Sequence, residues 1–140
     1  MADPEVQGLR EVSLRLRRLP EAVRRKHANK ALRAGMRPVA AAARRNVPVA
    51  TGLVRKNIRT RTVPLRQLTK GATVQLGVKS NRSGRGSGTD AYYWRFLELG
   101  TVNIERREFL ERGFEANKYK AAELIRRHLS RAVQTEARKR

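Results

Sequence analysis

Apolar residues recur every three or four positions near both ends of the chain, and this spacing predicts amphipathic helices. Within residues 3–19 the apolar positions are Val6, Leu9, Val12, Leu16 and Leu19. Asp3 and Pro4 are residue types that favour a helix cap and a first helical turn. A long C-terminal helix is predicted from about Glu108 to Ala137, with its apolar face at Phe109, Leu110, Gly113, Phe114, Ala121, Leu124, Ile125, Leu129, Ala132 and Val133.

Residues 21–46 form another predicted helix, rich in Ala and Arg, with a narrow stripe of small residues. Pro38 lies inside this pattern. It lacks a backbone N–H donor, and its ring clashes with the carbonyl of Ala34 in a regular helix. The sequence therefore predicts a kink or a break near Gly35 to Pro38.

Two short runs in the middle of the chain alternate in the way half-buried strands do. One face of residues 57–63 carries Ile58, Thr60 and Thr62, and one face of residues 72–78 carries Val74, Leu76 and Val78. Together these runs predict an antiparallel pair. Residues 91–100 are the most aromatic stretch, and their pattern fits either a strand or a short helix.

The predicted fold class is α+β, with N-terminal helices and a long C-terminal helix packed on a small, mainly antiparallel sheet. The sheet is expected near 53–63 and 72–79, and residues 91–106 are a candidate for a further strand. A single domain is expected over 1–140, since domains most often have about 100–150 residues. Residues 1–7 and 134–140 are expected to fray, and the Gly- and Ser-rich residues 80–90 to form a flexible loop.

Charge is the extreme feature of the composition. The 140 residues include 33 Lys and Arg against 12 Asp and Glu, which gives a net charge of +21. This excess indicates a polyanionic partner: nucleic acid, an anionic membrane or an acidic protein. The exception is a stretch that carries Glu98, Glu105, Glu108, Glu111 and Glu115. In a head-to-tail assembly, that stretch of one copy could meet the basic surface of the next.

The chain shows no constellation typical of an enzyme, a metal site or a cofactor site, so we expect a non-enzyme. It has no cysteine, which excludes disulfides and thiolate chemistry. His27 lies among basic residues, as surface histidines do, and His128 adjoins an apolar helix face, as rim or core histidines do. No run approaches the roughly 18 apolar residues of a membrane span. Because a signal peptide is also missing, no membrane partner is expected.

The glutamates also fit structural or interface roles better than catalytic ones. Glu108, Glu111 and Glu115 share one predicted helix face, where neighbouring Arg107 and Arg112 can neutralise them. Glu98 lies between two leucines. A carboxylate in such apolar surroundings is expected to have a defined partner, either an Arg or backbone amides.

Two motifs in order carry a family resemblance. The first is Asn-Val-Pro-Val-Ala-Thr-Gly-Leu at residues 46–53, after the Ala- and Arg-rich helix. The second is Tyr-Tyr-Trp-Arg-Phe-Leu-Glu-Leu-Gly-Thr at 92–101, followed by Phe109-Leu110 at the start of the last helix. Over about residues 8–130, the chain resembles the tail-completion, or head–tail joining, family of long-tailed bacteriophages. It departs from the family pattern at Leu99, where an aromatic is usual, and at Glu108 and Gly113, where proline is usual.

The resemblance implies a small α+β protein of the phage neck, without catalytic residues. Such a protein would form a ring, of six copies, between the head connector and the tail. It would be made in the host cytoplasm and reside in the virion. Its partners would be copies of itself, the connector or stopper, and the tail terminator or tail-tube proteins. Basic residues in the lumen could contact DNA phosphates without sequence preference.

Candidate site residues follow from this interpretation. Interface candidates are Arg82, Arg85, Tyr93, Trp94, Phe96, Glu98, Glu105, Glu108 and Glu111, and DNA-facing candidates are Arg55, Lys56, Arg59 and Arg61. Core packing is the favoured interpretation for Phe96, whereas core and interface are evenly balanced for Trp94. Thr51, Gly52 and Gly100 are interpreted as positions that set the backbone shape.

Three alternative functions share some of these features. A tail terminator also forms a ring, at the upper end of the tail. A non-specific DNA-binding protein would explain the charge but leaves the paired motifs unexplained. A ribosome-associated protein has the same weakness.

Overall fold

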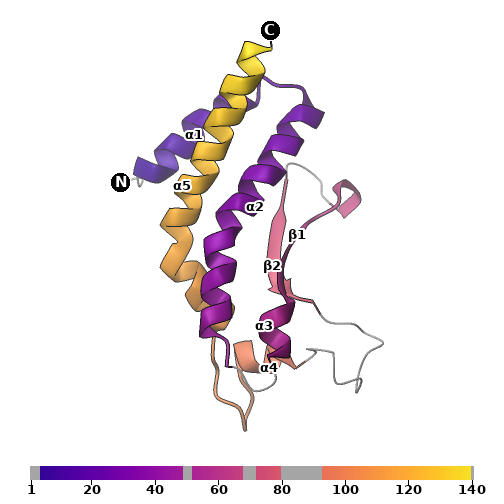
Figure 1. Ribbon diagram of the computed structural model, residues 1–140, viewed down its shortest axis with the longest axis vertical. Helices are drawn as coiled ribbons and strands as arrows, with labels where there is room; N and C mark the ends of the chain where they lie inside the picture. Colours follow the sequence, from indigo (N-terminus) through magenta and orange to yellow (C-terminus); the bar gives the residue numbers. More distant parts are fainter. Residues whose placement is uncertain (1–3, 49–51, 68–71, 80–92, 140) are drawn as a thin grey trace. The chain divides into compact units, whose positions relative to one another are not determined.

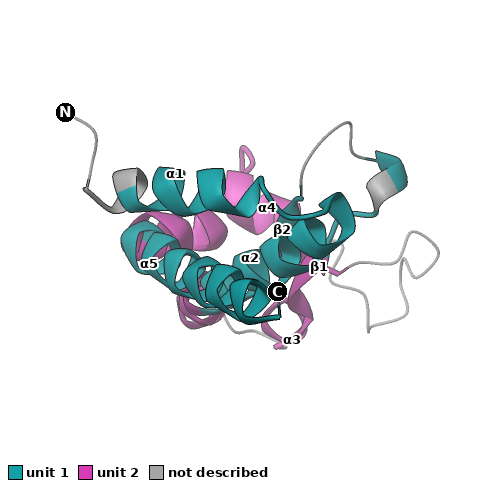
Figure 2. Cartoon of the chain, turned by 90° about the horizontal axis from the view of Figure 1, so that it is seen from above, with its two compact units in different colours: residues 1–37, 62–75, 118–140 teal, residues 38–61, 76–117 magenta. Residues whose placement is uncertain are grey.

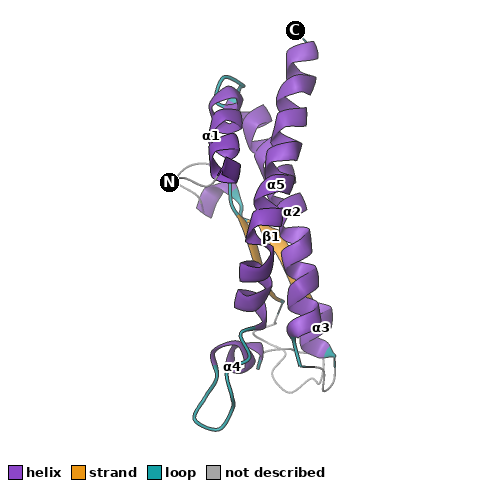
Figure 3. Cartoon of the chain, turned by 90° about the vertical axis from the view of Figure 1, so that its left-hand side faces the viewer, coloured by secondary structure: helices purple, strands orange, loops and turns teal. Residues whose placement is uncertain are grey.

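The computed structural model describes residues 4–48, 52–67, 72–79 and 93–139 (Figure 1). In chain order the elements are α1 (Pro4–Leu16), α2 (Glu21–Asn46), α3 (Leu53–Asn57), β1 (Ile58–Thr62), the 3-10 helix η1 (Leu65–Gln67), β2 (Val74–Val78), α4 (Trp94–Leu99) and α5 (Phe109–Arg138). Figure 3 shows that helices dominate and that the strands form one small sheet. The predicted α+β class with a long C-terminal helix is confirmed.

The chain divides into two compact units, coloured in Figure 2. Unit 1 contains residues 1–37, 62–75 and 118–140, and unit 2 contains residues 38–61 and 76–117. The long helices α2 and α5 each contribute residues to both units. The cores of the two units are therefore described separately.

Unit 1 packs α1 against the N-terminal part of α2 and the C-terminal part of α5 (Figure 1). Its buried cluster is Leu16, Ala31 and Leu129, surrounded by Val12, Leu19, Ile125 and Val133. Gly35 permits a close helix contact, because a Cβ there would lie 3.0 Å from the carbonyl oxygen of Ala121. The apolar spacings seen in the sequence thus correspond to this core.

Unit 2 packs the end of α2, α3, most of β1 and β2, and α4 around the start of α5. Its buried cluster is Ala43, Val47, Val54, Ile58, Val78 and Phe109, and Leu53, Leu76, Tyr93, Trp94, Leu97 and Leu110 pack against it. Gly113 of α5 crosses α2 closely. A Cβ at this position would lie 3.0 Å from the backbone nitrogen of Ala43 and 3.1 Å from the carbonyl oxygen of Val39.

The sheet is an antiparallel pair, as predicted. The N–H of Val63 donates to the carbonyl of Thr73 at one end, and that of Lys79 donates to the carbonyl of Asn57 at the other. This register places Ile58 opposite Val78, so that two buried residues form a cross-strand pair. The predicted face of Val74, Leu76 and Val78 is buried or half-buried, as expected, and in β1 the more buried face carries Ile58, Thr60 and Thr62.

Helix α2 continues from Glu21 to Asn46 with Pro38 inside it. Of the two predicted alternatives, the break is therefore wrong, and the kink stays a prediction. A missing hydrogen bond and a ring clash cost about 3 kcal/mol in a helix interior. Buried side chains lie on both sides of the proline, at Ala31 and Ala34 before it and at Val39, Ala40 and Ala43 after it. Burial on this scale can outweigh the local cost of the proline.

One expectation about the sheet is wrong, because residues 53–57 form the short helix α3 rather than strand. The aromatic segment, for which a strand and a short helix were both open, forms the helix α4 at Trp94–Leu99, followed by irregular chain, and the described part of 91–106 contains no further strand. Two apolar residues three positions apart fit a helix turn as well as the end of a strand. The local pattern therefore did not distinguish helix from strand, and tertiary packing decided which one formed. Asp3, Thr51 and the 80–90 loop lie outside the described residues. Gly52, with φ 77°, and Gly100, with φ 74°, confirm the predicted glycine-dependent backbone.

Candidate interaction surfaces

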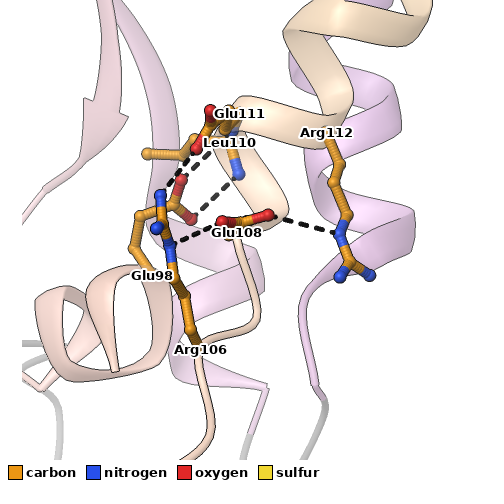
Figure 4. A network of polar contacts seen from close by, with 6 residues as sticks. All are labelled: Glu98, Arg106, Glu108, Leu110, Glu111 and Arg112. Carbon is orange, nitrogen blue, oxygen red and sulfur yellow. Dashed lines mark hydrogen bonds and ion pairs between the residues drawn. The ribbon is translucent and has the colours of Figure 1, made fainter. Parts of the chain in front are cut away.

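The segment from α4 to the first turn of α5 is built around Glu98 (Figure 4). One carboxylate oxygen accepts the backbone N–H of Leu110 at 3.0 Å, and the other accepts that of Glu111 at 3.1 Å. The first N–H groups of a helix have no partner within the helix, so Glu98 supplies these acceptors from another element. The expectation that Glu98 has a defined partner is confirmed, with backbone amides rather than an arginine.

The turn between α4 and α5 is shaped by two unusual backbone positions. Gly100 has φ 74° and approaches the backbone of Arg106 so closely that a Cβ would lie 3.0 Å from its nitrogen. Glu108 has φ 49°, a left-handed conformation that is costly for a residue with a side chain and closed to proline. Its N–H donates to the carbonyl of Glu98 at 3.3 Å. The start of α5 is thus fixed directly to α4.

Ion pairs join the glutamates of this segment to its own arginines (Figure 4). Arg106 bonds Glu108 at 2.6 Å and Glu111 at 3.0 Å, and Arg112 lies 3.8 Å from Glu108. The sequence predicted that Glu108 and Glu111 share one helix face. This is wrong, because Glu108 precedes α5 and has a left-handed backbone. The negative charge of the segment is balanced locally, and its exposed ion pairs contribute little to stability.

Apolar side chains are exposed on α4 and the turn that follows it. Phe96 is 47% exposed, Leu99 68%, Val102 103% and Ile104 41%. The favoured assignment of Phe96 to the core is therefore wrong, because α4 directs Leu97 rather than Phe96 to the buried cluster. The sequence analysis did not select Leu99, Val102 or Ile104. The sequence signal that could have identified them was the occurrence of three apolar residues at a turn, where no predicted core would bury them.

The remaining interface candidates are placed differently. Tyr93 and Trp94 are half-buried and pack against the unit 2 core, and the guanidinium carbon of Arg95 lies 5.6 Å from the centre of the Trp94 ring. Glu105 is exposed, with its carboxylate 3.9 Å from Arg107. Arg82 and Arg85 lie outside the described residues.

The four predicted DNA-facing residues are all exposed. Arg55 and Lys56 lie on α3, and Arg59 and Arg61 lie on the exposed face of β1. The four residues therefore lie on two elements that follow each other directly in the chain. Their role in binding DNA stays a prediction.

A second basic surface, which the sequence analysis did not single out, lies on α2 in unit 1. Lys26, Lys30, Arg33 and Arg37 are all exposed and line a hollow of about 420 Å³. Asn29, Ala34 and Thr62 complete its wall. The sequence contained a signal for this surface, since residues at i, i+4, i+7 and i+11 share one helix face.

The two histidines belong to unit 1. His27 is half-buried and bonds the Glu136 carboxylate at 3.0 Å, so it has a specific partner that the surface interpretation did not include. His128 is half-buried, consistent with a rim position. In the part of the chain that the structure describes, no group of three or more acidic or histidine residues could hold a metal ion. None of the described helices has both the length and the apolar character needed to cross a membrane.

Comparison with known protein families identifies the chain. The model of a family described as "Bacteriophage HK97-gp10, putative tail-component" matches residues 10–100, which extend from within α1 to the end of α4. Neither a curated protein nor a solved structure matches the chain. The family match covers well over half of the 140 residues and includes the first motif and residues 92–100 of the second, whereas Thr101 and Phe109-Leu110 lie beyond it. The chain therefore belongs to the HK97-gp10-like family of bacteriophage tail components.

Proposed function

We propose that the protein is a ring-forming subunit of the phage neck, which joins the head connector to the tail. Membership of a tail-component family implies a structural, non-enzymatic role in the virion and contacts with other tail proteins. The step from tail component to neck ring rests on the exposed apolar surface of α4 and its following turn.

Four exposed apolar residues on one short segment are typical of a surface that another protein covers. They are Phe96, Leu99, Val102 and Ile104. This surface lies in a stretch with locally balanced charge, whereas most of the chain is strongly basic. Copies that each carry a charge of +21 repel one another, so they associate most readily where their charge is balanced. These observations support a second copy of the chain as the partner at this surface.

The deciding experiment is a deletion in the phage that encodes the chain, followed by electron microscopy of the lysate. Loss of a neck subunit is expected to leave DNA-filled heads and finished tails of normal length that do not join. Expression of the wild-type chain from a plasmid should restore joined particles. Tails of abnormal length would instead identify a tail terminator. Normal particle yield and morphology would overturn a structural role in the virion.

A further inference from the structure

The basic surface on α2 is a straight row of four cations. Lys26, Lys30, Arg33 and Arg37 lie at spacings of four, three and four residues, and each is exposed at the edge of the same hollow. A helix rises about 1.5 Å per residue, so the row is about 16 Å long. Helix α2 is continuous over this span, which fixes the order and spacing of the charges.

No carboxylate neutralises this row among the described residues. The unit 1 glutamates with described side chains are engaged elsewhere: Glu11 with Arg15, Glu21 with Arg25, Glu123 with Arg126 and Arg127, and Glu136 with His27 and Lys139. The described residues that line the hollow include no acidic one. The row thus combines four positive charges that the described carboxylates of unit 1 do not balance.

The chemistry of the hollow distinguishes a phosphate backbone from a protein partner. The core of a protein interface is depleted of charged residues and enriched in aromatic ones. Here the wall has four cations, and its uncharged members are Asn29, Ala34 and Thr62. Single-stranded nucleic acid is typically bound by stacking on aromatic rings, and the described part of the wall has none. Duplex DNA presents a dense line of phosphate charges, one per strand for about every 3.4 Å of axis, so a row of cations about 16 Å long can contact several phosphates at once.

We infer that Lys26, Lys30, Arg33 and Arg37 bind the phosphate backbone of duplex DNA without sequence preference. The inference goes beyond the proposed neck ring, because it concerns a surface of unit 1 that a single subunit carries. It also differs from the sequence prediction, which assigned DNA contact to Arg55, Lys56, Arg59 and Arg61. No base-reading side chain is required, since phosphate contacts position a protein on DNA but do not specify sequence.

The test compares variants that remove the same number of charges. In the first, all four cations of the α2 row are replaced: Lys26→Gln, Lys30→Gln, Arg33→Gln and Arg37→Gln. In the second, the predicted α3 and β1 residues are replaced: Arg55→Gln, Lys56→Gln, Arg59→Gln and Arg61→Gln. A third variant carries Arg10→Gln, Lys120→Gln, Arg131→Gln and Arg138→Gln, which lie on α1 and α5. Gln has nearly the helix propensity of Lys and Arg, so the helices should form in each variant.

Binding is measured by fluorescence anisotropy with two labelled duplexes of unrelated sequence, across a series of salt concentrations. Wild-type protein is expected to bind both duplexes equally, with affinity that falls steeply as salt rises. Each phosphate contact contributes about 0.9 to the slope of log affinity against log salt. The α2 variant should therefore lose about 3 to 4 from this slope and more than about tenfold in affinity at low salt. In each of the other two variants, the slope of log affinity against log salt should fall by less than about 1.

Circular dichroism checks that each variant remains folded, and light scattering checks that its native mass equals that of wild type. Equal losses of DNA affinity and of salt slope in all three variants would show that binding depends on net charge alone, and this would overturn the inference. A larger loss in the α3 and β1 variant would assign DNA contact to those residues instead. Because the readout is DNA affinity rather than particle joining, it does not depend on whether the neck proposal holds.

Discussion

At the scale of single residues, Glu98 has a larger structural role than its position between two leucines suggests. Its carboxylate satisfies two backbone N–H groups at the start of α5, and its carbonyl accepts a third, from Glu108. A side chain 12 residues from Leu110 in sequence thus acts as the helix cap. The same contacts connect the candidate interface helix α4 to the long helix.

Replacement of Glu98 by alanine is expected to destabilise the protein by about 1–2 kcal/mol, because both N–H groups at the start of α5 lose their acceptor. Glu98→Gln keeps one acceptor oxygen and should lose about half as much. Urea denaturation followed by circular dichroism measures both. Glu105→Ala is the control, since it removes an exposed glutamate of the same segment and should change stability by less than about 0.5 kcal/mol. Equal effects of Glu98→Ala and Glu105→Ala would contradict the capping role.

At the scale of elements, α5 is reinforced by ion pairs along its own surface. Glu123 bonds Arg126 at 2.7 Å and Arg127 at 3.0 Å. Hydrogen bonding from Arg126 is the largest cause that lowers the pKa of Glu123, from 4.5 to about 2, and Arg127 adds to it. The pKa of Glu136 is also lowered, chiefly by its hydrogen bond with His27 of α2 and then by Lys139.

The Glu123 shift predicts how stability depends on pH. A carboxylate whose pKa is lower in the folded state stabilises the protein above its unfolded pKa, and this contribution disappears as pH falls through the folded pKa. Wild type should therefore have a higher urea midpoint than Glu123→Gln above about pH 4.5, and the difference should close toward about pH 2. Glu11→Gln, in a more exposed pair with Arg15, is expected to show a smaller difference. A difference between wild type and Glu123→Gln that does not change with pH would contradict this mechanism.

At the scale of the whole molecule, two properties bear on assembly: the strongly basic composition and the exposed apolar segment of α4 and its following turn. The charge opposes contact between copies, and salt screens that repulsion over about 10 Å or less at 0.1 M and above. The apolar segment supplies the attraction that is independent of salt. Self-association should therefore strengthen with salt, whereas binding to DNA should weaken.

Light scattering at about 0.5 M salt tests this expectation, because charge repulsion is then largely screened. The native mass of wild type should be a multiple of the 15.9 kDa subunit. A variant with Leu99→Ser and Val102→Ser should be monomeric and still folded, since both side chains are exposed. Leu14→Ser with Tyr119→Ser is the matched control, because these exposed residues lie in unit 1. Equal masses of the two variants would exclude the α4 segment as the contact.

Much of the architecture is determined locally and could be predicted from the sequence. The helices α1, α2 and α5 follow from apolar spacings, and the strands β1 and β2 follow from alternation, because each pattern has a single regular structure that buries its apolar face. The glycines at 52 and 100 were identified because few other residues adopt a left-handed backbone. The family was also recognisable, because each of its two motifs is a continuous run of residues.

Other features of the protein depend on contacts between residues that are distant in sequence, and these were decided by the tertiary structure. Burial on both sides of Pro38 keeps α2 continuous, and packing on the unit 2 core makes 94–99 a helix and leaves Phe96 outside. The partners of Glu98 and His27 lie 12 or more residues away, so no local pattern identifies them. The α2 row was visible as a periodicity, but only the folded chain shows that the carboxylates described around it are engaged with other cations. A sequence fixes the kind and spacing of charges, whereas the fold decides which of them remain unbalanced.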